Sequence, residues 1–465
     1  MSIILDKTIA VGLIVVIIFT ALAQGVVEPW SVLLFELTVT SLLLLWAIRV
    51  FVVRKLIITV PHLAWPLAGL IVIGMVQSVI WTDGAGRPQS LSFDVEATRS
   101  AVMILCCLLG CCLIAANFLV SDQRLRMLAK FLPIYGFGLA FIALVQHFGA
   151  GDTAYWPRAV RADGSFGPFI NRDHFAAYIE LLIAVPIALI VTRYVRGEKT
   201  LLYGGAAAIM GIAAIFSLSR GGVISLLAEM LLIVTIGLRR SQNTPHKHRS
   251  RTHGRTGRRT IEALTVTLII AAIVAGVAWL GAEPVIDRIA SGNLTNPSLN
   301  ADVHTFHSVR GAIWKDTWRL IRENPVAGVG LGAFELAYPI YAWDKGGEGI
   351  VAQAHNDYLQ VLADAGIFGG ALALWFVVIV MRTIVRSAGL HDPLSAGLAL
   401  GGGAGVFGLL VHSLFDFGLQ LPSHAVLFLS LSTVVSHLAA MAEERLPRNA
   451  ASANVIPDLV SEVPS

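Results

Sequence analysis

The segment AHNDYLQ, Ala354 to Gln360, holds the side chain best placed for chemistry, His355. It closes the longest hydrophilic stretch of a chain that is otherwise strongly apolar. We expect a helix to begin here, with Asn356 or Asp357 as its N-cap. The positive end of a helix favours a neutral imidazole, which can accept a proton. His355 is therefore a candidate general base, and the competing interpretation is a capping or hydrogen-bonding histidine.

Two arginines are candidates for binding phosphate. Arg220 lies in SRGG, a tight turn between two apolar segments, and is either a snorkelling anchor or a pyrophosphate ligand. Arg310 falls in the first turn of an expected amphipathic helix that starts at Ser308 and ends at Asn324-Pro325. A cation gains nothing from the dipole there, so Arg310 is not a cap, although a solvated arginine is the ordinary alternative. The apolar residues of this helix predict that it lies on the membrane interface: Ile313, Trp314, Thr317, Trp318 and Ile321.

Three further motifs carry candidate substrate-binding residues. NRDHFAAY at 171–178, where an outer loop re-enters the membrane, contains Arg172 and His174. VHSLFDFGLQLP at 411–422 places His412 and Asp416 four residues apart, which predicts one helix face. GVGLGAF contains Gly328 and Gly330, whose backbone N–H groups suit an anion in a tight turn. A nucleotide loop is excluded there, because it needs a preceding strand and a βαβ unit.

The composition requires a membrane protein. Of the 465 residues 56% are hydrophobic and 14% charged, and the mean hydropathy is +0.73. An ordinary soluble chain carries about 25% charged residues. A span needs about 20 mostly apolar residues, and about twelve such runs are present. They lie near 8–24, 31–53, 62–81, 99–120, 125–148, 173–194, 200–217, 222–238, 261–281, 367–386, 394–414 and 424–441.

Lysine and arginine fix an expected orientation through the positive-inside rule. The densest basic run, RRSQNTPHKHRSRTHGRTGRR at 239–259, is best explained as a cytoplasmic linker and needs no nucleic-acid partner. The segments expected outside are then 82–98, 149–172, 219–222, 282–366 and 415–423. The expected organisation is N-terminal helices (1–148), helices with the SRGG turn and basic linker (149–281), a large outer loop (282–366), C-terminal helices (367–441) and a cytoplasmic disordered tail (442–465).

These motifs together resemble one superfamily. SRGG, the long outer loop with NPVAGVGLGAFE, AHNDYLQVLADAGIFG and HSLFDFGLQLP are similar to segments of O-antigen ligases and related polysaccharide polymerases, over roughly residues 160–425. The resemblance implies an all-α, polytopic, GT-C-like glycosyltransferase of the bacterial inner membrane that needs no metal or other cofactor. It also implies transfer of an undecaprenyl-pyrophosphate-linked glycan, with inversion, to lipid A-core or another glycan acceptor on the periplasmic face.

By the same resemblance, His355 takes the position of the family's essential loop histidine. Arg220 takes that of the arginine in the SRGG-like turn, and Arg310 that of the arginine opening the loop helix. Asp173 stands where the family often has a second asparagine. The resemblance leaves the choice between ligase and polymerase open.

Two other interpretations compete with this one. A metal-dependent oligosaccharyltransferase would use an acidic pair such as Asp94 and Glu96, although Asp94 better fits an N-cap. A transporter or flippase would have about as many spans, but such proteins usually carry charged residues at mid-membrane depth, and the spans here hold few.

Overall fold

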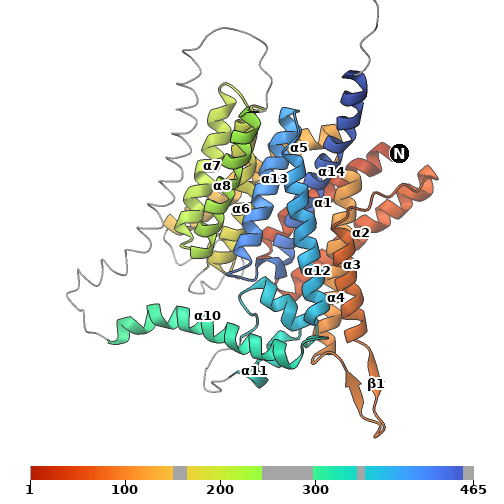
Figure 1. Cartoon of the computed structure of the whole chain (residues 1–465), viewed down its shortest axis with the longest axis vertical. Coiled ribbons are helices and arrows are strands. Elements are labelled where there is room, and N and C mark those ends of the chain that lie inside the picture. Colours follow the sequence, from red (N-terminus) through yellow and green to blue (C-terminus); the bar gives the residue numbers. More distant parts are fainter. Residues whose placement is uncertain (1, 150–164, 243–296, 343–350, 454–465) are drawn as a thin grey trace, which may run out of the picture.

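The computed structural model describes residues 2–149, 165–242, 297–342 and 351–453 (Figure 1). Within them, ten helices are long and apolar enough to cross a membrane, so the protein is an all-α, multi-pass membrane protein. These helices are α1 (Ser2–Leu22), α2 (Pro29–Val53), α4 (Val95–Phe118), α5 (Asp122–Phe148), α6 (Arg172–Val191), α7 (Lys199–Phe216), α8 (Arg220–Gln242), α12 (Asp357–Ser387), α13 (Pro393–His412) and α14 (Pro422–Ala453).

Two of the twelve expected spans differ from this set. The run at 62–81 forms α3 (Ala64–Gln77), whose 14 residues fall short of the roughly 20 that a perpendicular span needs. The run at 261–281 lies outside the described residues. The outer segment after α3 contains an unexpected hairpin of β1 (Ile80–Thr82) and β2 (Pro88–Ser90), in which Ile80 pairs with Ser90.

The helices α6 and α13 form the centre of the bundle and are the most buried of the spans. Glycines in α13 allow their close approach: a Cβ built on Gly401 would lie 2.6 Å from Val185 Cα. At Gly405 the corresponding distance to Leu181 Cα is 2.9 Å. Small residues at helix interfaces are a common means of association in membranes, where apolar burial alone gives little preference.

At one end of the bundle, α10 (Pro297–Glu323) and α11 (Phe334–Tyr341) lie across the ends of the spans, and the hairpin projects from the same end (Figure 1). Most of the apolar face of α10 does not meet lipid. Ile313 and Ile321 are buried in a second hydrophobic cluster with Val329, Phe334 and Tyr338. This face is therefore largely covered by protein, and Trp318 alone of the five residues predicted on it is exposed, at 45%, so a position at the membrane interface stays a prediction.

The helix α12 changes direction at Gly366, where φ is +61°. A Cβ at this position would collide with the backbone oxygen of Val326, so only glycine fits both the conformation and the space. The N–H group of Ile367 donates to Pro325 O at 2.9 Å. The kink separates the first residues of α12, which belong with the outer loop, from the apolar part that starts where the span was expected.

Candidate active site

The backbone at His355 is held in an unusual conformation. Its φ of +50° lies in the left-handed region, which favours glycine and asparagine. The next residue, Asn356, caps α12 by accepting the N–H groups of Tyr358 and Leu359, each at 3.0 Å. The expected helix start is thus confirmed, with Asn356 as the cap. His355 stands just before it, with its side chain 30% exposed.

The start of α12 is joined to residues 413–417, the turn that follows α13, which we call the Asp416 turn. Asn356 Nδ2 donates to Leu414 O at 3.0 Å, and the N–H group of Asp357 donates to Ser413 O at 2.9 Å. Asp357 also accepts the N–H group of Leu419 at 3.1 Å. These bonds bring His355 beside a segment about 60 residues further along the chain.

The outer helix α10 fixes the residue before His355. Trp314 Nε1 donates to Ala354 O at 3.0 Å, and the Ala354 N–H group donates to Gln360 Oε1 at 2.7 Å. Ala354 itself is fully buried. Trp314 therefore supports the position of the histidine and is not a membrane anchor.

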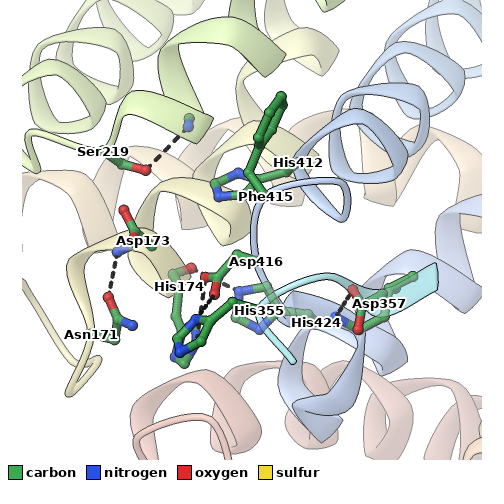
Figure 2. A network of polar contacts seen from close by, with 12 residues as sticks. Asn171, Asp173, His174, Ser219, His355, Asp357, His412, Phe415, Asp416 and His424 are labelled. Atoms are coloured by element: carbon green, nitrogen blue, oxygen red, sulfur yellow. Dashed lines mark hydrogen bonds and ion pairs between the residues drawn. The ribbon is translucent and has the colours of Figure 1, made fainter. Parts of the chain in front are cut away.

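The carboxyl group of Asp416 lies between two imidazoles (Figure 2). His355 Nδ1 lies 3.3 Å from Oδ1, and His174 Nε2 lies 3.6 Å from Oδ2. Phe417 packs edge-on against both imidazole rings. Burial by itself would raise the pKa of Asp416, but the hydrogen bond with His355 and the charges of the neighbouring histidines hold it well below its usual range.

An ionised Asp416 determines which nitrogen of His355 can act. The carboxylate accepts a hydrogen bond from Nδ1–H, which leaves Nε2 as the nitrogen with a lone pair. A buried aspartate that orients an imidazole and stabilises its protonated form is an arrangement that recurs in unrelated enzymes with histidine bases. The geometry therefore suits His355 to remove a proton from a hydroxyl group.

Asp416 does not share a helix face with His412. The helix α13 ends at His412, and Asp416 lies beyond it, in a turn where its N–H group donates to His412 O at 3.1 Å. The expected i, i+4 pair is wrong for that reason. His412 instead points to Glu180, with its Nδ1 at 3.0 and 3.1 Å from the two carboxylate oxygens.

Arg310 belongs to the same cluster as Asp416. Its Nη1 donates to Phe415 O at 2.8 Å, and its Nη2 donates to Asp173 Oδ2 at 3.2 Å. The helix α10 begins at Pro297, so Arg310 lies in its interior and the expected place in a first turn is wrong. The departure from the family pattern at Asp173 thus has a visible role, because this carboxylate pairs with the arginine.

Arg220 is exposed at the first residue of α8, and the tight turn predicted between two apolar segments is confirmed. Ser219 Oγ accepts the N–H group of Gly222 at 3.1 Å (Figure 2). In the described part of the chain, the guanidinium group of Arg220 has no protein hydrogen-bond partner. An exposed arginine of this kind is available to a phosphate at the membrane surface.

The start of α6 supplies the remaining side chains. Asn171 Oδ1 caps it by accepting the N–H group of Asp173 at 2.8 Å, and the carbonyl group of His174 lies 2.7 Å from His424 Nε2. Arg172 is half-buried at the first residue of the helix, and no contact in the described part joins it to Asp416.

In the glycine turn, residues 326–332, every N–H group from Gly328 onward donates to a protein acceptor. The N–H groups of Gly328 and Gly330 donate to Asn324 O and Asp364 O, at 3.1 and 3.0 Å. Gln77 Nε2 donates to Ala327 O at 2.7 Å, and the Leu331 N–H group donates to Gln77 Oε1. In this conformation the turn joins α3 to α12 and offers neither glycine N–H group to an anion, so a direct role in substrate binding stays a prediction.

Three buried carboxyl groups were not among the residues predicted from the sequence. Asp364 holds the glycine turn, and Glu180 and Glu229 lie fully buried inside the bundle. The signal for the last two was present, because each is a lone glutamate in an apolar run, AAYIELLIAV and SLLAEMLLIV. The N-cap interpretation of Asp94 is confirmed, since it accepts the N–H groups of Glu96 and Ala97 at 3.0 Å.

The fold and this site define a multi-pass membrane protein with a His–Asp pair and two arginines supplied by distant parts of the chain. Residues 205–374 match the family model described as O-Antigen ligase. The match supports the resemblance to O-antigen ligases and polysaccharide polymerases stated above, over the part of the chain that it covers. It includes His355, Arg220 and Arg310, whereas His174 and Asp416 lie outside it. The comparison with curated proteins found no match.

Proposed function

We propose that this protein is an inner-membrane glycosyltransferase that moves a glycan from undecaprenyl pyrophosphate to a sugar hydroxyl group on the periplasmic face. The observation that carries this proposal is the contact between His355 and the buried carboxyl group of Asp416. Arg310 donates a hydrogen bond to Phe415 O, in the same turn as Asp416. The family match to residues 205–374 supports a ligase or polymerase role.

In the proposed reaction, the acceptor hydroxyl oxygen attacks the anomeric carbon of the donor. The new glycosidic C–O bond forms as the bond to the pyrophosphate oxygen breaks, and attack opposite the leaving group inverts the anomeric centre. His355 Nε2 receives the hydroxyl proton, and Asp416 stabilises the resulting imidazolium. The bond electrons leave with the pyrophosphate, so atoms and charge balance without a further reactant.

The arginines are proposed to neutralise the charge that develops on the pyrophosphate. A fixed guanidinium group in a site of low dielectric is effective at this task, and its planar fork can hold two oxygens at once. Arg220 is exposed and suited to direct contact. Arg310 is already bonded to Phe415 O and Asp173, which gives it a fixed orientation beside the His–Asp pair.

Purified protein in proteoliposomes tests the reaction. With undecaprenyl-pyrophosphate-linked glycan as donor, we expect transfer to lipid A-core for a ligase, or elongation of the donor without lipid A-core for a polymerase. Loss of either surface lipopolysaccharide or secreted polysaccharide after gene deletion would assign the product in cells. Absence of transfer to both acceptor classes, together with solute flux into the liposomes, would favour a transporter instead.

The proposed orientation has its own test. Cysteines introduced beside Arg220 and His355 should react with a membrane-impermeant thiol reagent from the periplasm, and cysteines in the linker 239–259 should not. Labelling of the linker from outside would place the candidate catalytic residues on the cytoplasmic face and contradict the proposal.

A further inference from the structure

Three ionisable side chains lie buried in the helix bundle beneath the Arg220 turn and the Asp416 turn. Glu180 on α6, Glu229 on α8 and His412 on α13 are 0%, 0% and 1% exposed. A Cβ added to Gly408, one turn before His412, would collide with the carboxyl group of Glu229. Ionisable groups at this depth are rare in membrane helices and usually functional.

The two glutamates differ in their partners. Both oxygens of Glu180 lie within 3.1 Å of His412 Nδ1, whereas neither oxygen of Glu229 has a hydrogen-bond partner among the described residues. Burying an unpaired carboxylate is prohibitively unfavourable, so Glu229 is neutral. His412 has no hydrogen-bond partner at Nε2 among the described residues, but its Nδ1 lies against both oxygens of Glu180. These two contacts are the ground on which we treat Glu180 and His412 as a buried ion pair.

The pair touches the turn that carries Arg220. A Cβ built on Gly221 would lie 3.1 Å from His412 Nε2, and one built on Gly222 would lie 3.1 Å from Glu180 Oε1. The Gly222 Cβ would also lie 2.7 Å from Ala176 Cβ. The two glycines of SRGG therefore allow the backbone next to Arg220 to rest directly on the Glu180–His412 pair.

The same pair touches the Asp416 turn from the other side. The carbonyl oxygen of His412 accepts the N–H groups of Phe415 at 2.8 Å and Asp416 at 3.1 Å. Phe415 O in turn accepts the bond from Arg310. Figure 2 shows His412 beside Phe415.

We propose that the buried Glu180–His412 ion pair is a positioning element that holds the Arg220 turn at a fixed place relative to Asp416. This inference rests on the glycosyl transfer proposed above, because it assigns the pair a task in that reaction. Neither residue touches the substrate. The pair acts through the backbone of the two turns, so that the pyrophosphate ligand and the base reach one substrate together.

Two isosteric variants at equally buried positions test the proposal. Glu180→Gln keeps a hydrogen-bond acceptor for His412 and removes only the charge, and we expect kcat to fall about tenfold to a hundredfold with a small change in donor KM. Glu229→Gln replaces an already neutral group and should leave kcat within about twofold. Glu180→Asp, which keeps the charge, should retain more activity than Glu180→Gln. Equal kcat in Glu180→Gln and Glu229→Gln would overturn the proposal.

Infrared spectra of the folded protein test the charge assignment without reference to activity. Glu180→Gln should remove a carboxylate band, and Glu229→Gln should remove a protonated-carboxyl band. A protonated-carboxyl signal lost on Glu180→Gln would overturn the ion pair. If Glu180→Gln does not fold, the Glu180→Asp spectrum and kcat decide the question, since loss of the carboxylate band or of all activity there excludes a charged positioning pair.

The failure of the proposed reaction is distinguishable from the failure of this inference. If the wild type transfers no glycan, the reaction is wrong, whereas the infrared assignment still holds or fails independently. If the wild type transfers glycan and the activity of Glu180→Gln falls only in proportion to a lower melting temperature, the pair contributes to packing alone and the positioning role is refuted.

Discussion

The Asp416 turn and the glycine turn both contact α12 near its beginning, and they differ in how completely their polar groups are satisfied. Every N–H group from Gly328 to Gly332 donates to a protein acceptor. At the Asp416 turn, by contrast, Asp416 Oδ2 and His174 Nε2 have no hydrogen-bond partner among the described residues, although both are buried. Buried polar groups whose hydrogen bonds are all made stabilise the fold, whereas buried polar groups without a partner can bind a substrate or take part in a reaction. The predictions below test this difference.

The largest effect is expected at His355. His355→Ala should lower transfer about 10³-fold or more, because removal of a general base typically costs 10²–10⁴-fold. His355→Asn tolerates the left-handed backbone and should fold normally while remaining equally inactive. Single-turnover transfer in proteoliposomes measures both, and exposed His391→Ala is the matched control. Near wild-type turnover in the alanine variant would exclude a base at this position.

Asp416→Asn should have the next largest effect, about a hundredfold in kcat, because the amide cannot stabilise the protonated imidazole. The pKa of Asp416 is depressed in the folded protein, so its contribution to stability is present above the ordinary carboxyl pKa of about 4 and is lost as pH falls through the depressed value. The melting temperature of the wild type should therefore exceed that of Asp416→Asn most near neutral pH, with the gap narrowing in acid. Asp83→Asn, in the exposed hairpin, is the control and should leave kcat unchanged.

A smaller loss, about tenfold in kcat, is expected for Arg310→Lys. Charge is retained, but one ammonium group cannot hold Phe415 O and Asp173 as the planar guanidinium does. Arg319→Lys on the same helix is the control, since among the described residues the contact of Arg319 is an exposed pair with Glu323. Arg220→Lys should be impaired to a similar degree. If both lysine variants have normal rates and the alanine variants are inactive, the arginines act through their charge alone and the geometric role is wrong.

The smallest effect on catalysis is expected at the glycine turn. Gly328 has φ +68°, and a Cβ would collide with the backbone of Asp364. Gly328→Ala should lower stability by about 1–3 kcal/mol and leave kcat per folded molecule within about twofold. Thermal unfolding in detergent measures the first quantity, with Gly204→Ala, where a Cβ meets nothing, as control. A selective loss of donor binding without loss of stability would restore the anion-binding interpretation.

Sequence patterns were sufficient for ten of the twelve expected spans and for the ends of several helices, because apolar length and cap residues act locally. The start of α12 at Asn356 and the tight SRGG turn are examples. The partners of these motifs depend on contacts between residues far apart in the chain, which no local pattern encodes. Asp416 was assigned to a helix face with His412, yet the end of α13 redirects it to His355 and His174.

The protein cover over the apolar face of α10 was not predicted, for a related reason. An amphipathic pattern shows that one face of the helix must be covered, but it does not show whether protein or lipid covers it. Here the cover is α11 and the glycine turn, and Trp314 is used to hold Ala354. The lone glutamates in α6 and α8 are the opposite case, because an acidic residue inside an apolar run is a signal that the sequence itself contains.

The order of synthesis determines when the buried Glu180–His412 pair can form. Glu180 and His412 are separated by 232 residues, so α6 leaves the ribosome long before α13. A chain that grows from its N-terminus must therefore insert Glu180 into the bilayer without its partner. The carboxyl group of Glu180 stays protonated, and so neutral, until α13 has been made. Ionisation of Glu180 can follow only when α13 docks. The ion pair thus marks the docking of α13, and a chain truncated before α13 leaves Glu180 as a lone acid in lipid.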